Sequence, residues 1–416
     1  MTQSMQEPVE LEHVNPRLRQ IDFSGSILFL VATIFIFCIS NTVSAMTPAV
    51  NISFSSSAHT VSSSATKPVT NLPVVKLEQT NPLAQTIDKI DAARVILVGE
   101  THTRYDHHLV QLEILKLLYQ KSAKLAIGVE WFQQPFQKYL DAYIAGEIDE
   151  QEMLQQTGYF ERWRYDYRLY RPILQYAREH KIPVIALNAS KELSEALSKS
   201  GFDDLPAELK EQLPESYDWS DKAYEKRLRS VFDEHPEYSA DFENFLRAQL
   251  TWDESMAERT VKYLHDNPES RMLVFAGSGH IAYGSGIPKR IKRRIDVEQY
   301  SILVSQDFLP LSENSADFLV LSPVQSLQPF GLIGALLETK GKLLVIKGFS
   351  DDSAVKDAGL KKGTVIIGVG DVTVESFADF KLAILDKKPG DSIELHYVED
   401  AAAGHKDRKR IKLELR

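Results

Sequence analysis

The stretch VILVGETHTRYDHH, Val95 to His108, decides how the rest of the chain is interpreted. It begins with a run of apolar residues of the kind found in strands that are buried on both faces, and a glutamate and three histidines follow at once. Glu100 and His102 stand two positions apart, so their side chains point to the same side of an extended chain. A strand that ends in so many titratable groups indicates either a ligand site or the start of the next helix.

Similar apolar runs recur along the chain, and longer segments with helical spacing separate them. The runs are Val95–Val98, Leu125–Val129, Pro183–Leu187, Met272–Ala276 and Tyr300–Val304, and the helical segments include Asp106–Gln120, Tyr167–His180 and Tyr238–Leu264. Continuous apolar strands alternating with helices are typical of a largely parallel sheet with helices on both faces. We therefore expect an α/β domain over residues 80–315.

Polar side chains follow four of these strands. Glu100 and His102 end the first, Glu130 the second and Asn188 the third, and His280 comes after a glycine-rich turn. Ligands of open parallel sheets bind beyond the carboxyl ends of the strands, so these groups are expected to converge there. We therefore predict that Glu100, His102, Glu130 and His280 form a functional site. Simple packing remains the alternative for each one taken singly, as it does for Asp106 as a helix cap and His108 as a histidine at the edge of the core.

Composition limits the other possibilities. The 416 residues carry a formal net charge of -10, which argues against a nucleic-acid partner because phosphate binding needs concentrated Lys and Arg. The only cysteine, Cys38, lies in the apolar stretch ILFLVATIFIFCI, Ile27 to Ile39. This stretch is short for a membrane span and is followed by small residues up to Ala45, so residues 1–45 read as a secretory signal, with an uncleaved membrane anchor as the alternative. Residues 46–79 read as a flexible linker, and the rest is expected to be periplasmic or to face the periplasm from the membrane.

At this point the sequence resembles a known family. GETHTRYDHH, GVEWF, YRPILQYAREHKIPVIALNASKEL, AQLTWDESMAERT and LVFAGSGHIAYGSGIPKRI, in this order, are similar to the ChaN family of haem-binding bacterial lipoproteins. That family belongs to a superfamily with the Tiki metalloproteases and the erythromycin-esterase-like hydrolases. The resemblance implies ferric haem bound through a tyrosine where two protomers can meet. For the enzymatic relatives it implies a metal or acid/base site, which by position would be Glu100, His102, Glu130 and His280.

The segment YFERWRYDYRLYR, Tyr159 to Arg171, has the residue types that haem needs. It supplies aromatic surface, axial donors and cations for the propionates. The predicted haem-binding residues are Tyr159, Tyr165, Tyr167, Tyr170 and Arg171. The same composition also suits a helix whose tyrosines and arginines simply cover the sheet.

The rival function is a metal-dependent hydrolase, perhaps a peptidase. In it Glu100, His102 and His280 would hold a divalent metal ion or orient a water, and Glu130 would act as general base. On the helix around AQLTWDESMAERT, Asp253 shares a face with Gln249, Trp252 and Met256, where it is either a pocket residue or a buried partner for an arginine. The basic run Lys289–Arg294 reads as a solvated helix face.

Residues 323–416 resemble a PDZ domain of the bacterial protease-associated kind. The resemblance rests on SAVKDAGLKKGTVIIGVGD, Ser353 to Asp371, and on the later KPGDSIEL. It implies that the backbone N–H groups of Phe330, Gly331, Leu332 and Ile333 receive the C-terminus of a peptide, while the peptide adds a strand to the sheet. A PDZ fold kept only for docking is the alternative. The sequence thus predicts an exported protein of haem or iron handling with a peptide-binding module.

Overall fold

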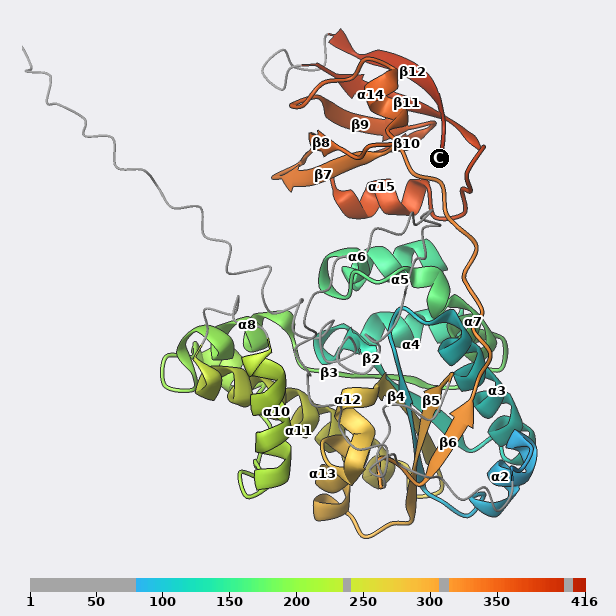
Figure 1. Ribbon diagram of the computed structural model, residues 1–416, viewed down its shortest axis with the longest axis vertical. Helices are drawn as coiled ribbons and strands as arrows, with labels where there is room; N and C mark the ends of the chain where they lie inside the picture. Colours follow the sequence, from blue (N-terminus) through green and yellow to red (C-terminus); the bar gives the residue numbers. More distant parts are fainter. Residues whose placement is uncertain (1–79, 235–240, 307–313, 400–406) are drawn as a thin grey trace, which may run out of the picture.

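The computed structural model describes residues 80–234, 241–306, 314–399 and 407–416. The expected signal or anchor (1–45), the linker (46–79) and Cys38 lie outside these residues. No helix of the described part is long and apolar enough to cross a membrane. Two bodies are seen in Figure 1, an α/β domain below and a smaller β domain, coloured orange to red, above it.

The α/β domain is built on a six-stranded parallel sheet in the order β3-β2-β4-β1-β5-β6. Its strands are β1 (Val95–Glu100), β2 (Leu125–Gln133), β3 (Val184–Asn188), β4 (Arg271–Gly277), β5 (Gln299–Ser305) and β6 (Phe318–Leu321). The predicted α/β fold with a parallel sheet is confirmed. The predicted boundary at residue 315 is wrong, because the sixth strand lies beyond it and pairs with β5.

Helices cover both faces of this sheet. The first face carries α2 (Leu83–Lys89), α3 (Tyr105–Lys121), η2 (Gln134–Phe136), α4 (Gln137–Ala145), α5 (Glu150–Gln156), α6 (Tyr159–Arg162), η3 (Tyr167–Leu169) and α7 (Arg171–Glu179). The second carries α8 (Lys191–Ser200), α9 (Ala207–Lys210), α10 (Lys222–Asp233), α11 (Phe242–Asp266), α12 (Ser278–Ile281), η4 (Ala282–Gly284) and α13 (Ile287–Arg294).

Alternate residues of each strand point to opposite faces of the sheet and belong to two separate apolar cores. In β1, Ile96 and Val98 join the core under α3 and α7, whereas Val95 and Leu97 join the core under α11 and α13. Because both faces are covered, the strand is buried along its whole length and shows no polar alternation. Gly99 is needed where β1 lies against β5, since a Cβ there would overlap the side chain of Leu303.

The β domain is an antiparallel sheet in the order β12-β11-β9-β8-β7, with β10 paired to β9. Its elements are β7 (Ala335–Lys340), β8 (Leu343–Phe349), α14 (Ala354–Asp357), β9 (Val365–Val369), β10 (Val372–Thr373), α15 (Phe377–Ala383), β11 (Ser392–Val398) and β12 (Lys409–Glu414). The predicted small, mainly β C-terminal domain is confirmed at this level.

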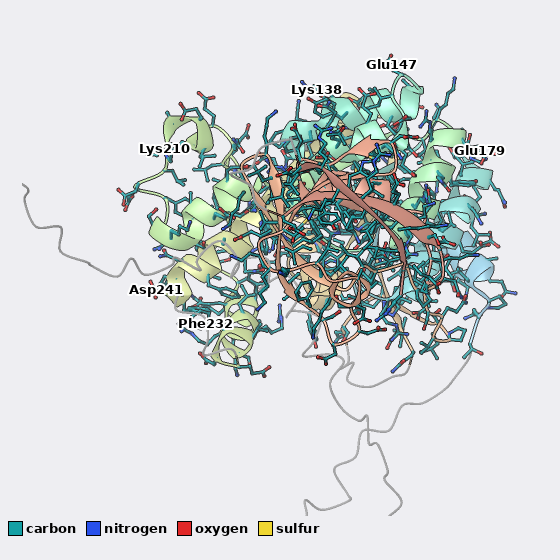
Figure 2. All side chains as sticks on the ribbon, turned by 90° about the horizontal axis from the view of Figure 1, so that it is seen from above. Lys138, Glu147, Glu179, Lys210, Phe232 and Asp241 are labelled. Atoms are coloured by element: carbon teal, nitrogen blue, oxygen red, sulfur yellow. The ribbon has the colours of Figure 1, made fainter. Side chains whose placement is uncertain are left out.

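The β domain lies over the first face of the α/β domain, where α15 contacts α5 and α6. Figure 2 looks down through it: Lys138 lies on α4, Glu147 just after α4, and Glu179 at the end of α7. Lys210, Phe232 and Asp241 mark the separate helical lobe of α9 to α11 on the opposite side. This placement leaves the segment from α6 to η3 between the two domains.

Candidate functional site

Glu100 and His102 form a buried pair at the end of β1. The Nδ1 atom of His102 lies 2.6 Å from Oε1 of Glu100. His108, from the first turns of α3, places its Nε2 3.4 Å from the other carboxylate oxygen of Glu100 and 3.1 Å from the backbone oxygen of His102. His108 is therefore part of this network, while its Nδ1 contacts Gln111.

Glu130 and His280 form a second pair on the other face of the sheet. Glu130 follows Ala126 in the alternation of β2, and Ala126 belongs to the core under α11. One carboxylate oxygen of Glu130 accepts a hydrogen bond from the backbone N–H of Gly277 at 2.7 Å, and the other lies 3.5 Å from Nε2 of His280. The opposite nitrogen of His280 contacts Asp253 at 2.6 Å.

The two pairs meet at Gly277, the last residue of β4. A Cβ at this glycine would stand 3.0 Å from Cε1 of His102 and 3.6 Å from Oε2 of Glu130. The chain thus needs a residue without a side chain where the two networks face each other. The four predicted residues are brought to one edge of the sheet, as the strand ends indicate, but from opposite faces.

The electrostatics of the site follow from burial and from this pairing. Burial alone would raise the pKa of Glu100, but the nearby His102 and His108 outweigh it, so this pKa is lowered. Burial would lower the pKa of His102, and the charge of Glu100 raises it instead. For His280, burial is likewise outweighed by Glu130 and Asp253, which raise its pKa to about 9. These shifts favour a carboxylate beside an imidazolium in the first pair and favour the imidazolium form of His280 in the second.

A narrow pocket of about 30 Å³ reaches this edge beside Glu130. Trp163 and Trp252 form walls of it, and Asn188 and Gln133 contribute polar groups. Asn188 donates to the backbone oxygen of Glu130 at 3.1 Å. The volume suits a water molecule or two and nothing larger.

The predicted metal-ligand set is not assembled. Within the described ranges, no group of three or more His, Cys, Asp or Glu side chains is arranged to hold a metal ion. Glu100 contacts His102 and His108, whereas His280 reaches Glu130 and Asp253. The geometry therefore gives the metal-dependent alternative no support.

Three of the four predicted haem tyrosines are core residues. Tyr159, Tyr167 and Tyr170 are fully buried, and burial raises the pKa of each hydroxyl well above its usual value. The hydroxyl of Tyr167 donates to Glu150 at 2.9 Å, and that of Tyr170 contacts the backbone oxygen of His102 at 3.4 Å. Their burial gives the prediction that they bind haem no support, and the assignment stays a prediction.

Tyr165 differs from these three because it is half-buried. Its ring lies 4.8 Å from that of His102, and it lines an open pocket of about 390 Å³ between the domains. The other lining residues include Arg104, Tyr105, Arg168, Leu169, Leu327 and Phe330. Arg171, also predicted to bind haem, instead pairs with Glu150 and with Asp386 of the β domain.

Several site residues escaped the sequence reasoning. Asp253 is buried and accepts hydrogen bonds from His280 and, at 2.5 Å, from the hydroxyl of Tyr224. Its charge also raises the pKa of the buried Arg290, as the arginine-partner alternative expects. Tyr105, which lines the open pocket, lies in the stretch Val95–His108, but the histidines of that stretch gave the stronger signal and Tyr105 was not predicted as a site residue. The basic run is solvated only in part: Lys292 and Arg293 are exposed, whereas Arg290 is fully buried with its Nε 3.2 Å from Glu254.

The predicted carboxylate-binding loop of the β domain is largely occupied by its own chain. The N–H of Gly331 donates to Lys387 and that of Leu332 to Arg416, both at 2.8 Å. Ile333 is buried in the domain core, and Phe330 lies under the cations of Arg168 and Lys381. The amides of Gly331 and Leu332 are therefore not open to a peptide terminus, and that part of the prediction is wrong.

Comparison with known proteins bears on the α/β domain. Residues 86–291, from α2 into α13, match the family model described as haem-binding uptake, Tiki superfamily, ChaN. The α/β domain is a ChaN-like domain. The comparison with curated proteins found no match.

Among solved structures, the ChaN-like domain is similar to ChaN of Campylobacter jejuni, which is described as binding haem cofacially. The two sequences are 18% identical, the TM-score is 0.48, and the match covers 59% of this chain and 93% of that chain. The β domain is similar to the PDZ domain of a carboxy-terminal protease from Vibrio cholerae in complex with peptide, with 20% identity, a TM-score of 0.17, and 21% and 93% covered. A third similar structure is the photosystem II D1 C-terminal processing protease, with 18% identity, a TM-score of 0.19, and 21% and 23% covered.

Proposed function

We propose that this chain binds ferric haem in the open pocket beside Tyr165 and serves in haem or iron handling. The observation that carries the proposal is the position of Tyr165, which is half-buried in a pocket with apolar walls while the other three predicted tyrosines are buried in the core. Membership of the α/β domain in a haem-binding family supports it. When bound, haem would supply a ferric iron with an axial position for a phenolate oxygen.

The pocket residues fit such a group. Leu327 and Phe330 offer apolar and aromatic surface, and Arg104 and Arg168 offer cations for the propionates. Arg104 holds Asp106 and Arg168 holds Asp166, each at 2.7 Å. A guanidinium has five N–H donors, and these contacts use only some of them, so donors remain for a carboxylate ligand.

The experiment is a titration of ferric haem into the full chain, followed through the Soret region. We expect a saturable, stoichiometric shift that Tyr165→Phe abolishes or displaces, because phenylalanine keeps the ring and removes the ligand oxygen. Tyr105→Phe tests the second tyrosine of the pocket, and Tyr176→Phe on α7 is the matched control. Binding that neither pocket variant alters would contradict the proposed ligand.

We further propose that the protein is exported, with residues 1–45 as signal peptide or membrane anchor, and that it acts in the periplasm. We also propose that two copies of the chain can meet at the bound haem. The apolar stretch 27–39 and the small residues after it support export. Cell fractionation of the full chain, with and without residues 1–45, distinguishes a released from an anchored protein. Size-exclusion chromatography with and without haem reports dimer formation.

We infer that the β domain binds an extended peptide as an added strand on β7. This strand is the last in the sheet order, so one of its edges is unpaired within the described sheet, and Leu336 on it is 64% exposed. The amides of Gly331 and Leu332 have other partners, so we expect little preference for a free peptide C-terminus. Screening matched free-acid and amidated peptides by fluorescence anisotropy measures that preference.

A second candidate is acid–base hydrolysis at the edge of the sheet. The specific observation is that Glu130 lines the narrow pocket and lies 3.5 Å from His280, so a carboxylate that borders the pocket is paired with a histidine behind it. Glu130→Gln should abolish ester or peptide hydrolysis while leaving haem titration unchanged. Turnover that persists in this variant would exclude the candidate.

A further inference from the structure

The segment Tyr159–Arg171, here named the cover segment, lies between the β domain and the Glu–His site (Figure 1). Its inner side contacts the site directly. The rings of Trp163 and Tyr165 each lie 4.8 Å from the ring of His102. Arg162 and Trp163 also line the narrow pocket beside Glu130. Whatever moves the cover segment therefore changes access to His102 and Glu130.

The site is closed in this arrangement. Glu100 is 0% exposed, His102 1%, Glu130 2% and His280 7%. The pocket of about 30 Å³ admits water and excludes a larger molecule. A ligand or substrate that reaches these side chains needs the cover segment to move.

The cover segment has little regular structure of its own to hold it in place. It consists of the four-residue helix α6, a turn in which Arg164 has a φ of 70°, and the three-residue η3. Helices of this length do not form alone in water, because one turn does not repay the cost of nucleation. Its position is therefore set by what packs against it, which is the core of the α/β domain on its inner side, where Tyr159, Tyr167 and Tyr170 are buried, and the β domain on its outer side.

On its outer side the cover segment packs against α15 of the β domain. Helix α15 and the two residues after it have two apolar sides: Phe380 and Ile384 belong to the core of the β domain, whereas Ala378, Leu382 and Leu385 belong to the core cluster of the α/β domain. One helix is thus shared by both domains.

Polar contacts surround this apolar docking. Asp386 pairs with Arg171 at the end of the cover segment. Asp379 accepts a hydrogen bond from Gln155 at 3.4 Å. The ring of Phe330 lies between the cations of Arg168 and Lys381, 4.9 Å and 3.9 Å from its centre.

We propose that the β domain gates the Glu–His site. Docked through α15, it holds the cover segment over His102 and Glu130; when a partner draws α15 away from α6, the cover segment loosens and the site opens. Peptide binding near β7 acts close to this contact, because Thr339 of β7 accepts the backbone N–H of Phe377, the first residue of α15. The inference rests on the second candidate function, hydrolysis at the Glu–His site, only in treating that site as one to which access matters.

Hydrogen–deuterium exchange of the full chain, read by mass spectrometry, measures the gate without haem or substrate. Leu382→Glu places a charge in the apolar contact, and Asp386→Arg sets two cations against each other. Asp352→Arg is the matched control, since Asp352 is an exposed carboxylate that pairs with Arg416 inside the β domain. We expect the amides of the cover segment to exchange at least tenfold faster in Leu382→Glu, less so in Asp386→Arg, and unchanged in the control.

Protection of β8 and β9 reports that the β domain of each variant is folded, and protection of β1 and β4 does so for the α/β domain. Unchanged exchange of the cover segment in Leu382→Glu would overturn the proposal. If α15 loses protection at the same time, the contact with α15 does not hold the cover segment in place. If α15 keeps its protection, the apolar contact does not hold the β domain in place. Faster exchange without any haem binding would leave the gate established and refute the haem proposal alone.

Discussion

Asp253 and His280 lie 2.6 Å apart, carboxylate oxygen to Nδ1, although they come from different helices of the second face. The hydroxyl of Tyr224 donates to the other oxygen of Asp253, and the cation of Arg290 lies 4.7 Å from the centre of the Tyr224 ring. His280 is thereby held with its Nε2 toward Glu130. This network fixes an imidazole at the edge of the sheet and favours its charged form.

The pairing of His280 makes stability depend on pH. The pKa of His280 is raised to about 9 in the folded chain. The protonated side chain therefore stabilises the fold fully below pH 6.5, the ordinary histidine pKa, and this stabilisation is lost as pH rises through about 9. We expect the free energy of unfolding of the wild type to fall from pH 6.5 to 9.5, by at most about 3 kcal/mol from this group. Urea unfolding at several pH values measures this fall, and His280→Gln should flatten it. Equal slopes in the two proteins would refute the assignment.

Removing Glu100 should destabilise the fold strongly. Glu100→Ala leaves His102 and His108 buried beside an empty space without their carboxylate, and breaking a buried pair in this way costs about 3–5 kcal/mol. Glu192→Ala is the matched control, because Glu192 is 54% exposed and pairs with Arg162 at the surface. The control should lose under about 1 kcal/mol. Urea unfolding midpoints of both variants measure the difference. Similar losses would show that the buried carboxylate of Glu100 stabilises the fold no more than the exposed one of Glu192.

Two glycines of the turn after His280 should differ in how well they tolerate a side chain. Gly284 and Gly286 have the same φ of 62°, but a Cβ at Gly284 meets nothing within 4 Å, whereas one at Gly286 would overlap the carbonyl oxygen of His280. Gly286 combines its positive φ with a ψ of -131°, so its expected loss includes backbone strain as well as steric overlap. Gly284→Ala should therefore cost about 1–2 kcal/mol for the left-handed backbone alone. Gly286→Ala should cost at least about 2 kcal/mol more, because the turn that carries His280 has to shift. Thermal unfolding of the two variants gives the comparison, and equal losses would rule out the overlap.

Much of the α/β domain is predictable because its strands are buried on both faces, which leaves continuous apolar runs in the sequence. The sixth strand escaped because Phe318–Leu321 is short and lies at the sheet edge, where its burial is only partial. The strand ends correctly indicated that Glu100, His102, Glu130 and His280 lie at one edge of the sheet. The partner of His280 was not predictable, because Asp253 reaches it from α11, 27 residues away in sequence.

The tyrosines of the cover segment show a different limit. Composition alone could not tell Tyr165 from Tyr159, Tyr167 and Tyr170, since all four stand in one short aromatic segment. Only the packing around α6 and η3 decides which of them lines the open pocket. The prediction that the loop at Gly331 and Leu332 binds a peptide carboxylate was wrong for a similar reason. Its N–H groups bond to Lys387 and Arg416, and no local pattern announces partners so distant in sequence.

The sharing of α15 by two apolar cores has a consequence for how this protein evolves. Ala378, Leu382 and Leu385 are encoded with the β domain, yet the α/β domain uses them as its own interior. Exchange of the β domain for an unrelated module would therefore expose an apolar surface over α5 and α6. Homologues that lack this module should carry polar residues at the outward positions of α5 and α6, so that the two regions change together along the family tree.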